Sequence, residues 1–189
     1  TGKIEDFAPH AKIIHVDIDP ASIQKNIAVD VPIVADARQA LTKLIDTLKK
    51  RGHSAKERKK LKSWHATLTA WRNEQRLRFD RTTEIIKPQY VVEKLYEMTR
   101  GRAIITTEVG QNQMWAAQYY LFDKPRTFLS SGGLGTMGYG FPAAIGAQVA
   151  FPDKLVIDIA GDGSVQMNIQ ELATVAQYKL PVKIAILND

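Results

Sequence analysis

The sequence predicts an α/β protein built on parallel sheets, in which the second half forms one sheet-based domain and the start is the tail of another. Apolar runs of strand length alternate with segments of helical periodicity, which is the order that parallel sheets require. Several of the apolar runs end in acidic or amide residues. The 189 residues are 44% apolar and 24% charged, a composition typical of globular domains.

The first 50 residues predict the closing part of a parallel α/β domain. The run "AKIIHVDIDP" is a strand stopped by Pro20, and "VPIVAD" is a second, shorter strand. "ARQALTKLIDTLKK" follows with the periodicity of a helix. We therefore assign residues 1–50 to the C-terminal part of this domain.

A charged helical connector is expected over residues 51–87. The stretch from Leu48 to Trp64 holds eight Lys or Arg and one Glu, which accounts for the net charge of +6. A nucleic-acid patch is one interpretation. A solvated connector is favoured because charge is nearly balanced elsewhere, so no nucleic-acid partner is expected. Trp64, Leu68, Trp71 and Leu77 recur near helical spacing, which indicates packing rather than a cofactor site.

Residues 88–189 predict a second α/β domain. A helix is expected over 87–100, because Pro88 suits a first turn and Gly101 suits a helix end. Further strands and helices then alternate: strands at 103–110, 126–131, 154–163 and 181–189, and helices at 138–151 and 168–179.

Composition also excludes several classes of protein. No apolar run reaches the 18 to 20 residues, roughly, that a membrane helix needs, and the start lacks a signal-peptide pattern. The absence of Cys excludes disulfides and thiolate metal sites, which fits a cytoplasmic location. The sequence starts without Met and stops just after a strand, so we expect a piece of a longer protein.

The stretch "GDGS" carries the clearest chemical signal. Asp162 lies between Gly161 and Gly163, directly after an apolar strand, and Ser164 follows. Ligands of open α/β sheets bind beyond the carboxyl ends of the strands. A helix start expected near Asn168 would direct amide groups there, which favours an anion. An acid and an anion are compatible through Mg²⁺, which takes carboxylate and phosphate oxygens.

The next strand supplies the other metal ligand. Asn188 and Asp189 follow "VKIAIL", and Asp189 lies 27 positions after Asp162. One helix and one strand fill that interval and return the chain to the same rim. We predict Asp162 and Asp189 as metal ligands and Asn188 as a ligand or a support. An isolated glycine turn without a ligand is the alternative.

This pattern resembles the thiamine diphosphate motif, in which GDG is followed some two dozen residues later by an Asn pair. "EVGQNQMWAAQYY" and "SSGGLGTMGYGFPAAIGAQVAFPDK" are similar to the catalytic subunit of acetohydroxyacid synthase, also called acetolactate synthase. The resemblance spans nearly the whole chain. It implies a thiamine diphosphate-binding fold preceded by the tail of a Rossmann-like domain, and an enzyme of branched-chain amino acid biosynthesis.

The resemblance also implies the reaction and its partners. Pyruvate is decarboxylated on thiamine diphosphate, and the enamine condenses with a second 2-oxo acid, pyruvate or 2-oxobutanoate. Mg²⁺ anchors the cofactor and FAD is structural. A homodimer or homotetramer with a small regulatory subunit is expected. Other thiamine diphosphate enzymes of this fold, such as pyruvate oxidase, glyoxylate carboligase or a catabolic acetolactate synthase, and a non-catalytic nucleotide-binding module remain alternatives.

Individual roles follow from matching positions. Gln111 and Asn112 resemble the pair that reaches the diphosphate, although the family usually has His at the second position. The carbonyl of Gly135 would accept a hydrogen bond from the aminopyrimidine. Met137 would hold the cofactor bent, unless it is simply a core residue. With these residues, Gly163, Ser164 and Asn188 complete the expected cofactor site.

Asp17 and Ile18 match positions that contact FAD, and a strand-ending Asp without a ligand is the alternative interpretation. No catalytic residue is expected in this sequence. The family's activating Glu lies in an N-terminal domain of a second subunit, and Glu84, Glu93, Glu97 and Glu108 are not in its context. The 189 residues alone are therefore predicted to be inactive.

Overall fold

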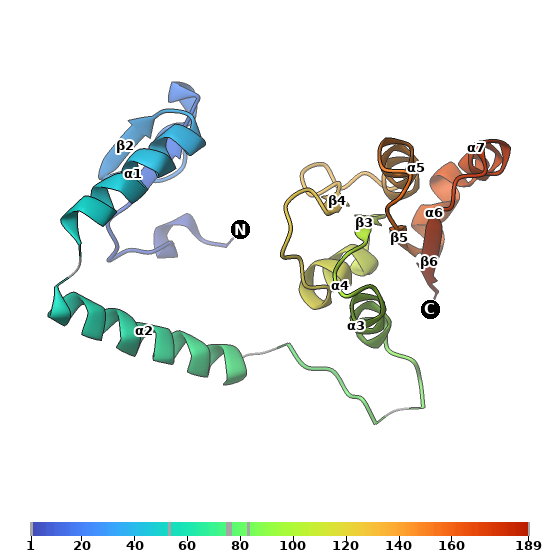
Figure 1. Cartoon of the computed structure of the whole chain (residues 1–189), viewed down its shortest axis with the longest axis horizontal. Coiled ribbons are helices and arrows are strands. Elements are labelled where there is room, and N and C mark those ends of the chain that lie inside the picture. The colour runs from blue at the N-terminus through green and yellow to red at the C-terminus, as the bar shows by residue number, and fades with distance from the viewer. Residues whose placement is uncertain (1, 53, 75–76, 83, 189) are drawn as a thin grey trace. The chain divides into compact units, whose positions relative to one another are not determined.

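The computed structural model describes residues 2–52, 54–74, 77–82 and 84–188. The chain divides into two compact units, residues 1–75 and 76–189 (Figure 1). Each unit combines helices with a parallel sheet, so the predicted α/β class is confirmed.

The first unit contains a two-stranded parallel sheet. Strand β1 (Ile14–Asp17) pairs with β2 (Val31–Val34), and Ile14 lies opposite Val31. The remaining elements are two 3-10 turns and two helices: η1 (Ile4–Asp6), η2 (Pro20–Ser22), α1 (Ala37–Arg51) and α2 (Ala55–Glu74). None of the described residues of this unit is buried.

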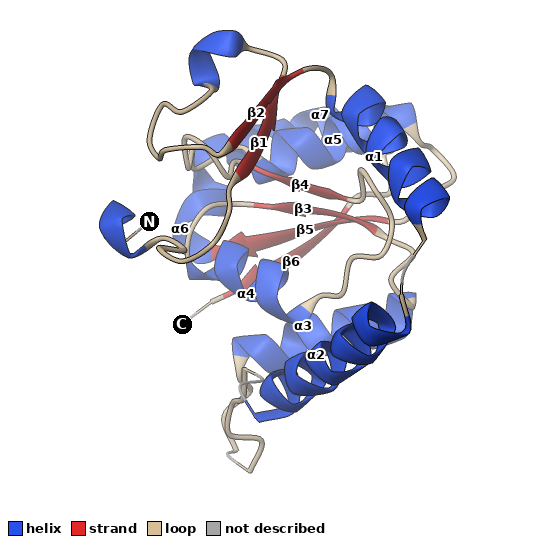
Figure 2. Ribbon diagram, turned by 90° about the vertical axis from the view of Figure 1, so that its left-hand side faces the viewer, coloured by secondary structure: helices blue, strands red, loops and turns tan. Residues whose placement is uncertain are grey.

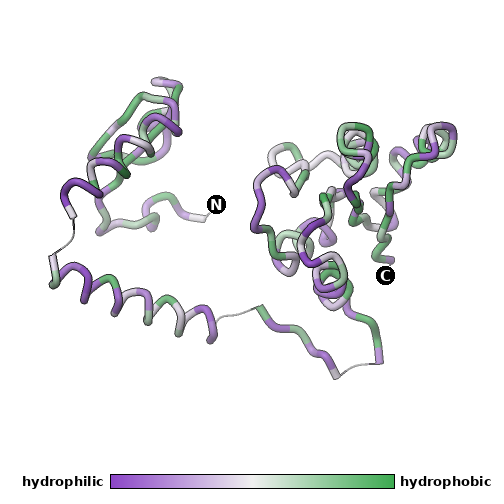
Figure 3. Tube along the Cα trace, viewed as in Figure 1, coloured by the Kyte–Doolittle hydropathy of each residue, from purple (hydrophilic) through white to green (hydrophobic). Residues whose placement is uncertain are grey.

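Local capping sets the helices of the first unit. Helix α1 begins where Asp36 accepts a hydrogen bond from the N–H of Gln39 at 3.1 Å. Helix α2 begins with a reciprocal pair, in which the Ser54 hydroxyl accepts from the N–H of Glu57 and the Glu57 carboxylate accepts from the N–H of Ser54. Figure 3 colours much of the start of α2 as hydrophilic.

The helix predicted across 51–87 is shorter than expected. Helix α2 ends at Glu74, and residues 77–82 and 84–87 are not helical. One reason is local, because Asp80 accepts hydrogen bonds from the N–H and the hydroxyl of Thr82, and such turns compete with helix formation. Trp64 and Trp71 pack edge to face, with ring centroids 5.5 Å apart.

The second unit is built on a four-stranded parallel sheet. Its order is β4 (Phe128–Ser130), β3 (Ile104–Thr107), β5 (Val156–Gly161) and β6 (Lys183–Leu187). The chain first adds β4 on one side of β3 and then returns to add β5 and β6 on the other. The direction of winding therefore reverses between β3 and β5.

The helices of this unit are α3 (Pro88–Thr99), α4 (Gln111–Tyr119), α5 (Gly140–Ala150), α6 (Asp162–Val165) and α7 (Leu172–Tyr178), with the 3-10 turn η3 (Gln166–Glu171) between the last two. In Figures 1 and 2, α3 and α4 lie on one face of the sheet and α5 lies on the other. No described helix has both the length and the apolar character needed to span a membrane.

Two helices differ from the sequence prediction. Helix α4 was not predicted, because "QNQMWAAQY" has no clear apolar stripe. The helix expected at 168–179 is split: helical structure starts earlier, at Asp162, and Asn168 has non-helical dihedrals (φ −132°) inside η3.

The core of the second unit has one layer on each face of the sheet, because successive strand residues point to opposite faces. Towards α3 and α4, Ile105, Ile157 and Ile159 pack with Val92 and Ala116. Towards α5, Ile104 and Val156 pack with Ala144. This packing fixes the carboxyl ends of β3, β5 and β6, where the predicted site residues lie.

Candidate functional site

A cavity of about 490 Å³ lies where the winding of the second unit's sheet reverses. Open α/β sheets form their ligand crevice at such a point, because the connections after the two central strands diverge to opposite faces. The segments that follow β3, β4, β5 and β6 all contribute to its wall. They include the following predicted residues: Gln111, Asn112, Met137, Asp162, Gly163, Ser164 and Asn188.

Asp162 and Asn188 lie at the same rim of the sheet. The strand register pairs Gly161 with Leu187, so the two polar residues follow at matching positions on adjacent strands. Both line the cavity. Asp189, the other predicted metal ligand, lies outside the described residues. Within the described part of the chain, no three His, Cys, Asp or Glu side chains cluster as a metal site. An ion bound here would need amide or ligand oxygens as well, which suits Mg²⁺.

Ser164 stabilises the turn that carries Asp162. Its side chain is almost fully buried, and its hydroxyl lies 3.3 Å from both the N–H and the carbonyl oxygen of Gly161. The hydroxyl therefore accepts from the first and donates to the second. Asp162 itself remains exposed at the cavity.

The helix start at the cavity is not the one expected from the sequence. Asn168 lies within the kink of η3, and its side-chain amide donates to the carbonyl of Gly138 at 2.5 Å. Helix α4 begins at the cavity instead, because Gly110, Gln111 and Asn112 line it. The conformation of Gly110 (φ 148°) makes the sharp turn from β3 into α4 possible.

Asn112 connects the start of α4 to β5. Its side chain is 4% exposed, and its Nδ2 donates to the carbonyl oxygen of Ile159 at 2.9 Å. This bond brings together the two segments that border the crevice. The side-chain N–H that was expected to reach a diphosphate already has a backbone partner, so that contact stays a prediction.

Met137 lies beside the GDG turn. It precedes α5 and its side chain is 43% exposed, so the alternative of a core residue does not apply. A Cβ added at Gly163 would lie 4.0 Å from the terminal methyl of Met137. Gly135 has a left-handed conformation (φ 65°), and its N–H donates to the carbonyl of Ser131 at 3.0 Å. Gly135 is not among the residues that line the cavity.

Two fully buried acids behind the cavity were not singled out as functional by the sequence analysis. Glu108 follows β3, and Asp158 lies within β5; neither has exposed surface. Burial raises the pKa of Asp158 to about 7; the Thr106 hydroxyl opposes this shift and the charge of Glu108 adds to it. The sequence signal that could have identified Asp158 is an acid placed inside the apolar run "LVIDIA".

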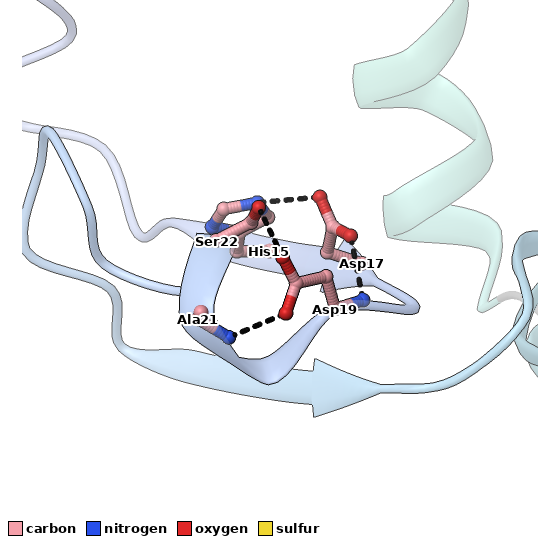
Figure 4. Close-up of polar contacts among 5 residues, drawn as sticks. All are labelled: His15, Asp17, Asp19, Ala21 and Ser22. Carbon is pink, nitrogen blue, oxygen red and sulfur yellow. Dashed lines mark hydrogen bonds and ion pairs between the residues drawn. The ribbon is translucent and has the colours of Figure 1, made fainter.

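The first unit has a separate cavity of about 850 Å³. Asp17, at the end of β1, lines it together with His15 and Ser22. One oxygen of Asp17 accepts from the N–H of Asp19 at 2.9 Å, and the other lies 3.9 Å from Nε2 of His15 (Figure 4). Ile18 is 72% exposed and does not line this cavity.

Comparison with known proteins gives similarity along the whole chain. The family described as thiamine pyrophosphate enzyme, C-terminal TPP binding domain, matches residues 108–189. The thiamine pyrophosphate enzyme central domain matches residues 1–44. Both families refer to the same cofactor, because thiamine pyrophosphate is another name for thiamine diphosphate.

Individual relatives are similar to this chain over all of its residues, at 47% to 51% identity. The chain is 48% identical to the acetolactate synthase large subunit of Haemophilus influenzae and 47% identical to acetolactate synthase isozyme 3 large subunit of Escherichia coli. It is 51% identical to the chloroplastic acetolactate synthase 1 of Nicotiana tabacum. Each match covers all of this chain but only 28% to 33% of the relative, so the chain spans about a third of their length.

Proposed function

Because the chain belongs to the thiamine pyrophosphate enzymes, we propose that it forms part of an acetolactate synthase. The complete enzyme would decarboxylate pyruvate and join the two-carbon product to a second 2-oxo acid, pyruvate or 2-oxobutanoate. This reaction serves branched-chain amino acid biosynthesis. The identity of 47% to 51% to acetolactate synthases over the full chain supports this choice within the family.

The observation that carries the proposal is the composition of the 490 Å³ cavity. Seven residues that were predicted from the sequence to serve the cofactor line this single cavity, although they come from four separate segments of the chain. A non-catalytic nucleotide-binding module would not require Met137 and Asp162 to lie at the same crevice.

The residues of the cavity fit a diphosphate held through a metal ion. Asp162 and Asn188 would supply oxygen ligands to Mg²⁺, and Gln111 at the start of α4 would contact the diphosphate. Met137 would pack against the rings of the cofactor, because its flexible thioether adapts to flat surfaces. When bound, thiamine diphosphate supplies the carbanion chemistry that cleaves and forms the carbon–carbon bonds.

A flavin site in the first unit is a further part of the proposal. Asp17 presents a carboxylate at a strand end, which is the usual partner of ribose hydroxyls. Within the part of the chain that the structure describes, its two oxygens accept from one backbone donor, the N–H of Asp19, so they retain capacity to accept further hydrogen bonds. Ile18 is exposed beside it and would pack against the same ligand.

The domain organisation and the partners are proposed from the relatives. Residues 1–50 would be the end of a central domain, 51–87 a connector, and 88–189 the start of the cofactor-binding domain. The relatives named "large subunit" favour a small regulatory subunit as a partner, and a homodimer or homotetramer in the cytoplasm is expected. Glu108 is unsuited to activate the cofactor, because both of its oxygens accept backbone N–H groups.

Titration of the full-length protein with thiamine diphosphate, with and without Mg²⁺, tests the cofactor assignment. Binding that requires the metal is expected, and metal-independent binding of a nucleotide instead would overturn the proposal. Acetolactate and acetohydroxybutyrate are then measured with pyruvate and 2-oxobutanoate as substrates. Consumption of oxygen with release of hydrogen peroxide would indicate a pyruvate oxidase.

A further inference from the structure

The loop that carries Met137 is hydrogen-bonded to the buried carboxylate of Glu108. Glu108 has no exposed surface, and its two oxygens accept hydrogen bonds from different backbone groups. The N–H of Gly138 donates to Oε2 at 2.7 Å, and the N–H of Phe141 donates to Oε1 at 2.9 Å. Phe141 is in the first turn of α5, so the carboxylate also faces the positive end of that helix.

Gly138 is held on its other side as well. Its carbonyl accepts from the side-chain amide of Asn168 at 2.5 Å. Its conformation is left-handed (φ 87°), and an added Cβ would lie 2.8 Å from Nδ2 of Asn168 and 2.9 Å from Cβ of Met167. The peptide groups on both sides of Gly138 are therefore fixed by side chains from two other segments.

The other end of the loop is fixed by Ser131. Its carbonyl accepts from the N–H of Gly135, and its hydroxyl accepts from the N–H of Thr136, each at 3.0 Å. Met137 is thus the one residue between two anchored positions, Thr136 and Gly138. Its side chain reaches the cavity beside Gly163, whereas Glu108 does not line the cavity.

We propose that Glu108 is a positioning residue for the cofactor site, which acts by fixing the backbone on which Met137 stands. This inference rests on the proposed function of the cavity. It differs from a purely structural role because the effect on catalysis passes through Met137. A carboxylate is required, because each of its two oxygens accepts a hydrogen bond. In Glu108→Gln, the NH₂ group of the amide is a donor and would face one of the two N–H donors, so that hydrogen bond would be lost.

The test uses the full-length protein and Glu108→Gln. Without cofactor, the amides of Gly138 and Phe141 should exchange with deuterium about tenfold faster. The Kd for thiamine diphosphate with Mg²⁺ should stay within about threefold, because Asp162 and Asn188 are unaffected, whereas kcat should fall roughly 10- to 100-fold. Asp158→Asn is the matched control, since it alters a fully buried acid that makes no hydrogen bond to this loop. An equal loss of kcat in the control would overturn the proposal.

A double-mutant cycle with Met137→Ala identifies the route of the effect. In the Met137→Ala background, Glu108→Gln should cause little further loss of kcat, because the side chain that it positions is already absent. Full additivity of the two losses would overturn the proposal.

Asn168→Ala provides a second variant if Glu108→Gln does not fold. It removes the other contact to Gly138 at a half-buried position, and its loss of kcat should be smaller but also non-additive with Met137→Ala. Additive losses would contradict the inference here too. The outcome is separable from the proposed function: failure of the wild-type protein to bind thiamine diphosphate would reject that function, whereas amide exchange would still report whether Glu108 holds the loop.

Discussion

Each unit has an acidic residue at the carboxyl end of a parallel strand, but the two strands differ in how well they are buried. Asp162 follows β5 in a four-stranded sheet whose neighbouring strand residues, such as Ile159 and Ala160, have no exposed surface. Asp17 ends β1 in a two-stranded sheet, in a unit whose described residues include none that is buried. Both acids line a cavity, but only the first cavity is backed by a packed core.

The two acids are thus chemically alike, but they differ in how firmly the fold fixes their positions. A packed core restricts the strand end, so that Asp162, Met137 and Asn188 are held relative to one another by the fold. The carboxylate of Asp17 accepts a hydrogen bond from the N–H of Asp19, and its other oxygen lies 3.9 Å from Nε2 of His15, so these contacts come from its own neighbours in the chain. Substitutions in the two units can therefore test whether the core of the second unit supports its site.

Gly140→Ala should have the largest effect, because the start of α5 touches the sheet at this residue. An added Cβ would lie 2.4 Å from the backbone N of Glu108 and 2.5 Å from both the Thr107 backbone C and the Asp158 Oδ1. Backbone atoms of a central strand cannot retreat, so we expect a loss of more than about 4 kcal/mol in the free energy of unfolding. Urea denaturation of the full-length protein would measure it.

Gly146→Ala is the matched control in the same helix. Gly146 is exposed, and nothing lies within 4 Å of an added Cβ. Replacing a helical Gly by Ala should therefore stabilise the protein by roughly 0.5 to 1 kcal/mol. Equal stability of the two variants would show that α5 does not rest on the sheet as described.

Much of the second unit was predictable, because its strands are short apolar runs that end in polar residues. The helix Pro88–Thr99 has the predicted first-turn Pro, and it is followed by Arg100 and Gly101 in left-handed conformations. The joint placement of Asp162 and Asn188 followed from the spacing alone, since one helix and one strand return the chain to the same rim of a parallel sheet.

The errors come from contacts that local patterns do not contain. Helix α4 has buried residues of two kinds, Asn112 and Ala116, so its buried face is not apolar and gave no periodic signal. The kink at Asn168 arises where its side chain bonds to Gly138, 30 positions earlier in the chain. The bond from Asn112 to Ile159 is likewise tertiary. A sequence pattern predicts which face of a helix is apolar, but it does not predict which distant carbonyl will accept a hydrogen bond from a buried side-chain amide.

The stability of the second unit should depend on pH through Asp158. Its pKa is raised from 3.8 to about 7 in the folded protein. As pH rises between these values, the unfolded chain releases this proton before the folded chain does, so the free energy of unfolding falls. Above pH 7, roughly, the loss is complete, at up to about 4 kcal/mol from a shift of about three units.

Asp158→Asn should remove this dependence. The Thr106 hydroxyl, which donates to Oδ1 of Asp158 at 2.8 Å, would keep an acceptor in the amide oxygen. The variant should match the wild-type protein near pH 4 and exceed its stability near pH 8, as measured by urea denaturation across that range. Asp46→Asn, at an exposed position of α1, is the control. A wild-type advantage at pH 8 would contradict the assignment of a raised pKa.

Asp162→Ala should weaken binding of thiamine diphosphate in the presence of Mg²⁺ by more than about 100-fold, because it removes a predicted ligand of the metal. The free energy of unfolding should change little, since Asp162 is exposed. Isothermal titration with increasing Mg²⁺ would measure the effect, and excess metal should restore part of the affinity. Unchanged affinity at every metal concentration would place the metal elsewhere.

Asp17→Asn should have the smallest effect and should be confined to the first unit. The amide keeps one oxygen acceptor but loses the charge, so the affinity for FAD should fall by roughly tenfold, which is the range of one charge-assisted hydrogen bond. Flavin fluorescence would measure this fall, and binding of thiamine diphosphate should be unaffected. Asp162→Ala should show the reverse pattern, so each variant should weaken the binding of one ligand and leave the other unchanged. If Asp17→Asn weakened thiamine diphosphate binding as strongly as FAD binding, the two cavities would not be independent sites. The contrast between an acid supported by a core and an acid held by local contacts would then have no functional consequence.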